Sequence, residues 1–189
     1  SVLNFTKGLS PEIEKLEDDL ITPILDRFVM NVTALNSYLK CPLGFYYNNF
    51  IRIPSAKNEA TEFGSAIHYA LHYFFDKMKN HPQNEFPSQQ SFIELFEYYM
   101  NRHKESFSKE QFARRIEQGE LVLSNYYEKY IHTFNKIILL EHSINTVVDG
   151  VPIKGKLDKL EFDGKNVNVV DYKSGDPDKA LPKLKGPSD

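Results

Sequence analysis

The alternation of apolar and polar positions divides the chain into a helical part and a later strand part. From residue 60 to residue 79, apolar side chains recur at intervals of three and four, which predicts one long amphipathic helix over Ala60–Lys79. Serines that can cap a helix precede two more helical patterns, Gln89–Lys104 and Lys109–Phe134. Shorter helices are predicted upstream: from Ser10 to about Ile21, from Ala34 to Lys40 with Thr33 as its cap, and from Leu43 to Phe50.

Beyond residue 136 the apolar pattern changes to that of strands. Three strand patterns, Ile137–Val148, Val151–Phe162 and Val167–Tyr172, are separated by the dipeptides Asp149-Gly150 and Asp163-Gly164. Asp-Gly between two strand patterns is a strong signal for a tight hairpin turn. The chain is therefore predicted to be an α/β protein, with a mainly helical N-terminal half followed by an antiparallel meander of three strands.

The predicted sheet has an open edge close to the end of the given chain. Unpaired backbone groups on such an edge invite pairing with another chain, and three strands are few for an independent sheet. We therefore expect the natural protein to continue past Asp189, so that the 189 residues are a fragment lacking C-terminal elements.

Composition is that of an ordinary globular domain. Hydrophobic residues make up 41% and charged residues 26% of the chain, and no apolar run approaches the roughly 20 residues of a membrane span. The N-terminus shows no charged-then-apolar signal pattern, and the single cysteine excludes an internal disulfide, so we expect a cytoplasmic protein with no membrane partner. The net charge of −3 argues against a general nucleic-acid coat protein, although basic residues cluster locally.

Two carboxylates and a lysine in the last two strand patterns suggest metal chemistry. Asp158 lies in one pattern, and Asp171 and Lys173 lie two residues apart in the next, which places both on one face of a strand. Carboxylates bind Mg²⁺, which also binds phosphate, and a nearby lysine can orient a water and stabilise an anionic transition state. The alternative is a surface hairpin in which an exposed Asp and Lys form an ordinary ion pair.

Four segments resemble one nuclease family when they are taken in order. Gly155-Lys-Leu-Asp158 and Asp171-Tyr-Lys173 resemble the G-x-x-D and D/E-x-K motifs of the PD-(D/E)XK nuclease superfamily, and Gly64-Ser-Ala-Ile-His68 is similar to its G-x-x-x-H motif. The segment from Ser37 to Tyr47, with Cys41-Pro42 at its centre, resembles the start of the RecB-like and AddB-like branch, the nuclease domain of helicase–nuclease subunits. The resemblance covers residues 33 to 175.

The resemblance implies a restriction-endonuclease-like core and a set of site residues. We expect an N-terminal helical arm or linker over residues 1–30, a partial nuclease domain over 31–175 and a truncated tail over 176–189. The resemblance also implies metal ligation of Mg²⁺ or Mn²⁺ by His68, Asp158, Asp171 and the backbone carbonyl of Tyr172, with Lys173 as the catalytic lysine. From the residues alone, a histidine on an apolar helix face such as His68 is more often a packed histidine than a metal ligand. Glu141 is a candidate supporting acid or a solvated strand residue.

The function implied is that of a metal-dependent DNA exonuclease in an ATP-dependent helicase–nuclease of DNA repair and recombination. Its partners would be DNA and a helicase domain or subunit. The main alternative is a catalytically inactive nuclease-fold module that binds or channels DNA or docks a helicase. A plain protein-interaction module is a second alternative, which an absence of salt-dependent DNA binding would favour.

Two features depart from the branch pattern. No Q-x-x-x-Y helix follows Lys173. Iron–sulfur members use one early cysteine and three late ones, and Cys41 stands at the early position, but a single thiolate cannot hold a cluster. An iron–sulfur cluster is therefore not possible within this chain alone, and a small buried hydrophobe is the simpler role for Cys41.

Basic and aromatic residues near the motifs are candidates for DNA contact. Lys154, Lys156 and Lys159 flank Asp158, and Arg114 and Arg115 lie in a basic helical segment. Unpaired bases can stack on tyrosines, for which the candidates are Tyr46, Tyr47, Tyr126 and Tyr127. Each of these groups is also compatible with a solvated face or with core packing.

Overall fold

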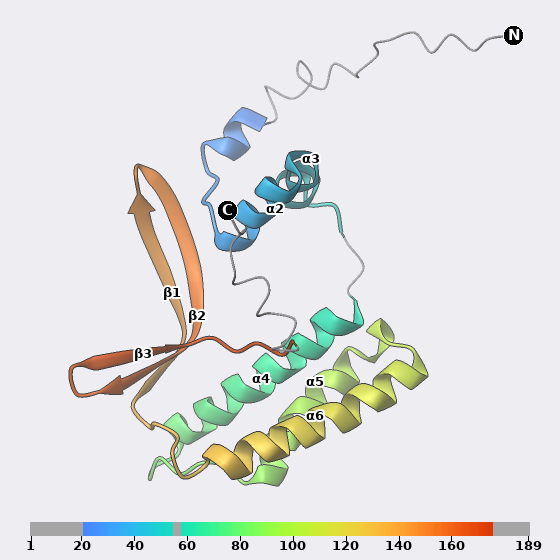
Figure 1. Cartoon of the computed structure of the whole chain (residues 1–189), viewed down its shortest axis with the longest axis vertical. Helices are drawn as coiled ribbons and strands as arrows, with labels where there is room; N and C mark the ends of the chain where they lie inside the picture. The colour runs from blue at the N-terminus through green and yellow to red at the C-terminus, as the bar shows by residue number, and fades with distance from the viewer. Residues whose placement is uncertain (1–20, 55–57, 176–189) are drawn as a thin grey trace, which may run out of the picture. The chain divides into compact units, whose positions relative to one another are not determined.

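The computed structural model describes residues 21–54 and 58–175 of the chain (Figure 1). The chain forms two compact units, one of residues 1–55 with 145–155 and the other of residues 56–144 with 156–189. The predicted helix from Ser10 lies almost wholly outside the described residues, as does the predicted tail over 176–189. The predicted domain boundaries stay a prediction.

The first unit is built on short helices. α2 spans Val32–Lys40, α3 spans Pro42–Phe45 and a π-helical turn, η1, spans Tyr46–Ile51. The side chain of Asn31, in extended conformation, accepts a hydrogen bond from the backbone of Ala34 and caps α2. The prediction that Thr33 is the cap was therefore wrong, since Thr33 already lies inside the helix. The helix begins earlier because Asn31 is an equally good capping residue.

The hairpin tip that belongs to the first unit is joined to the segment before α2 by backbone hydrogen bonds. Met30 donates to the carbonyl of Pro152 at 3.1 Å and accepts from Lys154 at 2.8 Å, forming a single parallel bridge opposite Ile153. A segment distant in sequence thus covers part of one strand edge, which limits the unpaired backbone there.

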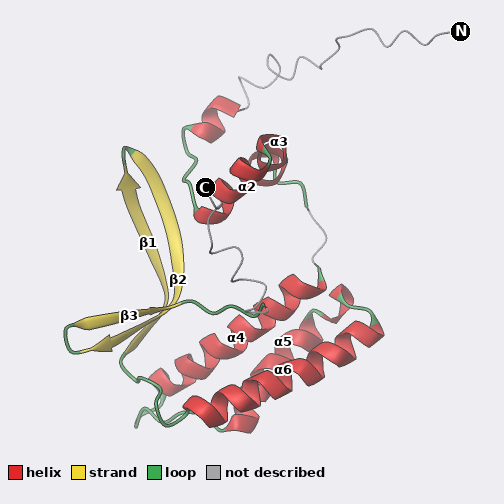
Figure 2. Cartoon of the chain, viewed as in Figure 1, coloured by secondary structure: helices red, strands yellow, loops and turns green. Residues whose placement is uncertain are grey.

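The second unit contains three long helices that pack on one another (Figure 2). They are α4 (Glu59–Asn80), α5 (Gln89–Arg102) and α6 (Lys109–Tyr130), and a 3₁₀ turn, η2 (Lys104–Ser106), precedes α6. Ser88 and Ser108 cap α5 and α6 as predicted, the latter in a capping box with Gln111. The buried core consists mainly of one stripe of α4 and the facing sides of α5 and α6: Phe63, Ala66, Ile67, Ala70, Leu71, Phe74, Phe75, Met78, Phe92, Phe96, Met100, Leu123 and Ile138.

The strands form one sheet in the order β1-β2-β3. β1 spans Ile138–Val148, β2 spans Val151–Asp163 and β3 spans Asn166–Val170. β2 and β3 pair antiparallel, with Glu161 opposite Asn168 and Lys159 opposite Val170. Asp149, Gly150 and Gly164 have positive φ, as tight turns between strands require.

β3 is shorter than predicted, since it ends at Val170 rather than at Tyr172. The backbone N–H of Tyr172 donates to the side-chain carboxylate of Asp158 at 2.8 Å instead of to a carbonyl of the neighbouring strand. Asp171 and Lys173 therefore lie in the segment that follows the strand, and the strand geometry expected for them does not apply.

The observed architecture confirms the predicted fold class. Helices dominate the N-terminal half, and a three-stranded antiparallel sheet follows. Among the residues that the structure describes, none of the helices combines the length and the apolar character needed to cross a membrane.

Candidate active site

His68 and Asp158 are brought together from distant parts of the sequence. His68 lies on α4, on a stripe beside the buried one, and Asp158 lies on β2. Nδ1 of His68 is 3.3 Å from Oδ1 of Asp158. The other oxygen of Asp158, Oδ2, accepts the N–H of Tyr172, so the carboxylate is held at one end and directed at His68 with the other. Both side chains are partly exposed and accessible to a ligand.

Asp171 and Lys173 pair with each other. Nζ of Lys173 lies 2.6 Å from Oδ2 of Asp171, and the two side chains are 80% and 52% exposed. This is the geometry of the simple ion pair that the sequence left open. Within residues 21–54 and 58–175, no group of three or more His, Cys, Asp or Glu side chains converges in a way that could hold a metal ion.

The His68–Asp158 pair nevertheless fits one edge of a metal site. Two ligand atoms about 2.1 Å from Mg²⁺ in neighbouring octahedral positions lie about 3 Å apart, close to the observed 3.3 Å. Carboxylate and imidazole donors also suit Mn²⁺. Asp171 directly precedes Tyr172, whose N–H is hydrogen-bonded to Asp158. The carboxylate of Asp171 itself is paired with Lys173.

The acid predicted to support the site, Glu141, lies on β1 with a positive φ of 49°. Its carboxylate is 2.8 Å from Nζ of Lys156 and 3.9 Å from Nδ1 of His72. The hydrogen bond from Lys156 lowers the pKa of Glu141, an effect that partial burial opposes. Because its pKa is lowered, Glu141 carries a negative charge beside the site at neutral pH. Nδ1 of His72 is buried without a hydrogen-bond partner in the described part of the chain.

One cavity of about 690 Å³ connects these groups. His68, Asp158, His72, Glu141 and Lys156 all line it. The cavity also has an aromatic side and a side of small residues: Tyr69, Tyr73 and Tyr99, and Ala60, Thr61, Gly64, Ser65 and Ser174.

Gly64, in the segment that resembles G-x-x-x-H, allows a close approach at this cavity. A Cβ at this position would lie 3.0 Å from Oγ of Ser174, tighter than ordinary van der Waals contact. The absence of a side chain lets the segment after Lys173 run close to α4. The spacing between Gly64 and His68 thus places the histidine one helical turn from that contact.

Lys159 does not belong to a DNA-binding surface, contrary to its selection as a candidate. It is 1% exposed, with its ammonium group 2.7 Å from Glu161 and 3.8 Å from the ring centroid of Phe75. The same ammonium group lies 5.6 Å from the ring of Tyr172. A buried ammonium cannot reach a phosphate, so Lys159 supports the packing behind Asp158 instead.

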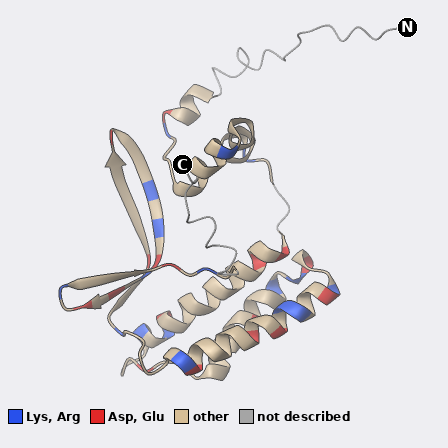
Figure 3. Cartoon of the chain, viewed as in Figure 1, with Lys and Arg blue, Asp and Glu red and all other residues tan. Residues whose placement is uncertain are grey.

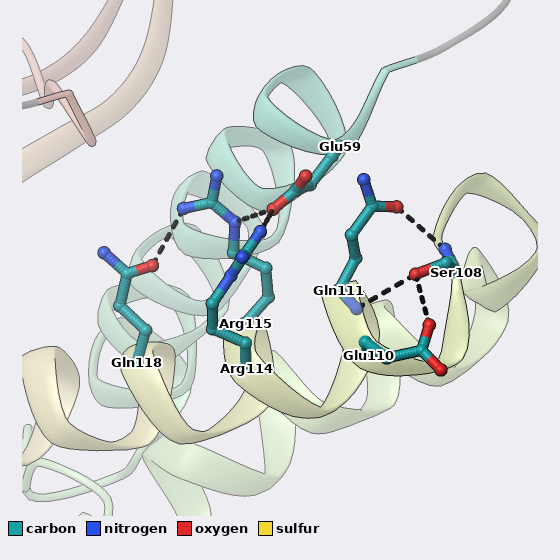
Figure 4. Close-up of polar contacts among 7 residues, drawn as sticks. All are labelled: Glu59, Ser108, Glu110, Gln111, Arg114, Arg115 and Gln118. Carbon is teal, nitrogen blue, oxygen red and sulfur yellow. Dashed lines mark hydrogen bonds and ion pairs between the residues drawn. The ribbon is translucent and has the colours of Figure 1, made fainter.

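The candidate arginines join two helices. Arg114 and Arg115 of α6 both donate to Oε1 of Glu59 at the start of α4, each at 2.7 Å (Figure 4). Arg115 also lies over the ring of Phe63 at 4.8 Å and donates to Gln118. These bonds engage both guanidinium groups in holding α6 to α4. Arg114 is 66% exposed and Arg115 is 22% exposed, so Arg114 is the more accessible of the two.

Basic side chains are not gathered along the described helices. Figure 3 shows the glutamates of α4 at its start and its lysines at its end, whereas α6 carries both signs along its length. Lys156 is 56% exposed and lies at the cavity, whereas Lys154 is exposed on the hairpin tip that belongs to the first unit. Of the candidate cations, Lys156 is the one that the structure places at the cavity.

Cys41 has a structural role that its sequence position did not reveal. Its side chain accepts a hydrogen bond from the N–H of Gly44 at 3.3 Å and caps α3, and Pro42 follows at the first helical position. Cys41 is exposed, so the prediction of a buried small hydrophobe was wrong. Phe45, at the end of this segment, is 7% exposed and packs edge-on against Phe28 and Tyr38.

The tyrosines of the cavity were not among the residues predicted to form the site. Tyr69 and Tyr73 follow His68 and His72 by one position each, so that all four share neighbouring stripes of α4. The four-residue interval from Tyr69 to Tyr73, like that from His68 to His72, indicates that each pair lies on one side of the helix. Tyr99 comes from α5, and nothing in the local sequence shows that it faces the same space.

Comparison with known proteins gave one match. A family model described as the PD-(D/E)XK nuclease superfamily matches residues 29–186, most of the chain. Searches of curated proteins and of solved structures each gave no significant match.

Proposed function

Because the chain belongs to the PD-(D/E)XK nuclease superfamily, we propose that it hydrolyses phosphodiester bonds of DNA with the help of Mg²⁺ or Mn²⁺. Phosphodiester hydrolysis is the general chemistry of this superfamily. The observation that supports a catalytic site in this chain is the convergence of His68 and Asp158 at 3.3 Å, in a cavity that Ser174, the neighbour of Lys173, also lines.

The proposed roles follow from charge and position. Asp158 and His68 would hold the metal ion, and Asp171 would complete the ligand set together with the carbonyl of Tyr172. When bound, the metal ion would neutralise charge on the phosphate and lower the pKa of a water. Lys173 has a long, 80% exposed side chain, which suits it to hold the attacking water and to stabilise the anionic transition state.

The ion pair between Asp171 and Lys173 favours a second candidate function, an inactive nuclease-fold module that binds DNA. In that case the pair would be permanent, and the described residues would bring no three donors together for a metal ion. Activity instead requires substrate and metal ion to separate the pair. An exposed ion pair contributes only about 0–1 kcal/mol, so its separation is a small barrier.

A cleavage assay distinguishes the two functions. Labelled single-stranded and duplex DNA would be incubated with the 189-residue chain while Mg²⁺ or Mn²⁺ is titrated. We expect metal-dependent cleavage that Lys173→Ala and Asp158→Asn each reduce at least about 100-fold, a loss typical of removing one group that stabilises a transition state. Lys165→Ala, an exposed lysine in the turn between β2 and β3, should cleave like the wild type.

Two results would contradict a catalytic role. One is equal cleavage by the wild type and Lys173→Ala, which would indicate a contaminating nuclease. The other is DNA binding by the wild type without cleavage at any metal concentration, which would favour the inactive module.

The wider context is also part of the proposal. We propose exonucleolytic action beside a helicase domain or subunit in DNA repair, because the segment from Ser37 to Tyr47 resembles the RecB-like and AddB-like branch. The packing of Phe45 and the capping by Cys41 give that segment a defined conformation without a metal cluster. Digestion of end-labelled and circular single strands tests the exonuclease part, since an exonuclease leaves the circle intact.

A further inference from the structure

Three tyrosines form a continuous aromatic surface in the cavity that contains His68 and Asp158. The ring centroids of Tyr69 and Tyr73 are 4.4 Å apart, and those of Tyr69 and Tyr99 are 5.2 Å apart. Successive rings are tilted by 45° and 47°. The rings therefore touch and present one extended surface to the cavity.

Tyr99 packs against the core, but core packing does not account for Tyr69 and Tyr73. The buried stripe of α4 carries the core side chains, and neither Tyr69 nor Tyr73 is among them. Tyr73 is 39% exposed, whereas Tyr126 and Tyr127, the tyrosines selected from sequence in the same unit, are partly buried against the core. Tyr69 and Tyr99 are partly buried, so the three rings form an aromatic surface that is open at Tyr73, and such a contiguous accessible apolar surface can mark a ligand-binding site.

The dimensions and lining of the cavity suit part of a nucleotide strand. About 690 Å³ lies in the range of roughly 300–1,000 Å³ that is typical of small-ligand sites. The cavity combines an aromatic side for a base with the His68–Asp158 pair, which would hold a metal-bound phosphate, and Lys156 also lines it, with its ammonium group paired to Glu141.

We propose that Tyr69, Tyr73 and Tyr99 form a subsite for one unstacked nucleobase of a DNA single strand, adjacent to the phosphate held at His68 and Asp158. Aromatic side chains bind bases by stacking, with little sequence preference, when the base face is free. In a duplex both faces of a base are covered by its neighbours, so the subsite favours single strands or frayed ends. The position of the phosphate rests on the proposed function, whereas the stacking surface does not.

Binding in EDTA tests the subsite without strand cleavage. Fluorescence anisotropy would measure the affinity of the 189-residue chain for a labelled single strand and for the same sequence as a duplex. Tyr73→Leu keeps an apolar side chain but removes the ring, and Tyr73→Phe keeps the ring. Tyr130→Leu is the matched control, because Tyr130 is 38% exposed and does not line the cavity.

We expect Tyr73→Leu to bind the single strand about 5- to 150-fold more weakly, the range that corresponds to loss of one stacked base. Tyr73→Phe and Tyr130→Leu should bind like the wild type, and duplex binding should not change in any variant. Unchanged single-strand affinity in Tyr73→Leu would overturn the subsite. An equal loss in Tyr130→Leu, an equal loss for duplex, or no DNA binding by the wild type would also overturn it.

Cleavage measured with Mg²⁺ separates failure of the subsite from failure of the proposed function. If the wild type cuts DNA while Tyr73→Leu binds single strands normally, the subsite fails and the nuclease stands. If neither the wild type nor any variant cuts DNA, but Tyr73→Leu alone loses single-strand affinity, the nuclease fails and the subsite stands.

Discussion

At the scale of the residue, Lys159 departs most from its expected role. It lies next to Asp158 in sequence, among lysines that suggested a phosphate-binding surface. Alternation along β2 instead directs it to the opposite face from Asp158, where it is enclosed by Glu161, Phe75 and Tyr172. Burial lowers the pKa of Lys159, while its hydrogen bond with Glu161 opposes that shift. Lys159 lies over the ring of Tyr172, and the N–H of Tyr172 holds Asp158. Lys159 therefore stabilises the site through Tyr172.

We expect Lys159→Met to lower the free energy of unfolding by about 3 kcal/mol, since it removes one partner of a buried ion pair and leaves the carboxylate of Glu161 uncompensated. Urea unfolding at neutral pH measures the loss. The double variant Lys159→Met with Glu161→Leu should recover most of it, because an apolar pair of similar volume needs no compensating charge. A single variant as stable as the wild type would show that the ion pair contributes nothing.

At the scale of the element, the contact between α5 and α6 depends on one glycine. Gly119 lies in the middle of α6, where intrinsic helix propensity disfavours it by about 1 kcal/mol relative to alanine. A Cβ at this position would lie 2.1 Å from Cζ of Phe96, which is fully buried. The two helices therefore approach each other more closely than any side chain at position 119 would allow. The weak point in the helical pattern is a packing requirement.

We expect Gly119→Ala to destabilise the protein by about 1–3 kcal/mol, because overpacking against Phe96 outweighs the gain in helix propensity. Thermal unfolding followed by circular dichroism measures the change. Combining it with Phe96→Leu, which removes the ring atoms that the new Cβ would meet, should make the alanine less harmful than it is alone. Stabilisation by Gly119→Ala in the wild-type background would contradict the close approach.

At the scale of the whole molecule, every residue of the candidate site belongs to one of the two compact units. The unit of residues 56–144 and 156–189 contains α4, β1 up to residue 144, β2 from residue 156 and the segment after β3. The His68–Asp158 pair and the aromatic surface are therefore defined without reference to the first unit. This unit is also rich in ion pairs that involve glutamates, which makes its stability sensitive to acid.

We expect the free energy of unfolding to fall as the pH drops below about 4.5, the ordinary pKa of glutamate. Hydrogen bonds from Arg114 and Arg115 lower the pKa of Glu59, and local hydrogen bonds lower that of Glu110. Burial acts to raise the pKa of Glu161, but its bonds with Lys159 and Asn168 outweigh burial and lower it. Each group loses its stabilising contribution as the pH falls through its lowered pKa.

One carboxyl works in the opposite direction. Burial and the neighbouring Glu120 raise the pKa of Glu97, so its protonation adds stability as the pH falls through that raised value. Urea unfolding between pH 7 and pH 3 should still show a net loss, and Glu59→Gln should lose less than the wild type. A parallel pH dependence in the two proteins would mean that the bonds of Glu59 do not contribute.

The sequence by itself determined the elements and the family. Apolar periodicity, the capping serines and the two Asp-Gly turns depend on residues close together in the chain, so they predicted α4, α5, α6 and the hairpins. The motif segments around His68, Asp158 and Asp171 indicated the superfamily, which the match over residues 29–186 then showed. Local interactions and residue order contain this information without knowledge of the packing.

Only the tertiary structure decided which side chains share a space. Sequence spacing suggested a common strand face for Asp171 and Lys173, but the hydrogen bond from Tyr172 to Asp158 ends β3 before them. Sequence spacing also could not show that Lys159 is enclosed, or that Tyr99 joins Tyr69 and Tyr73 beside His68. Each of these outcomes depends on contacts between segments far apart in the chain, where burial and partner choice are settled by packing.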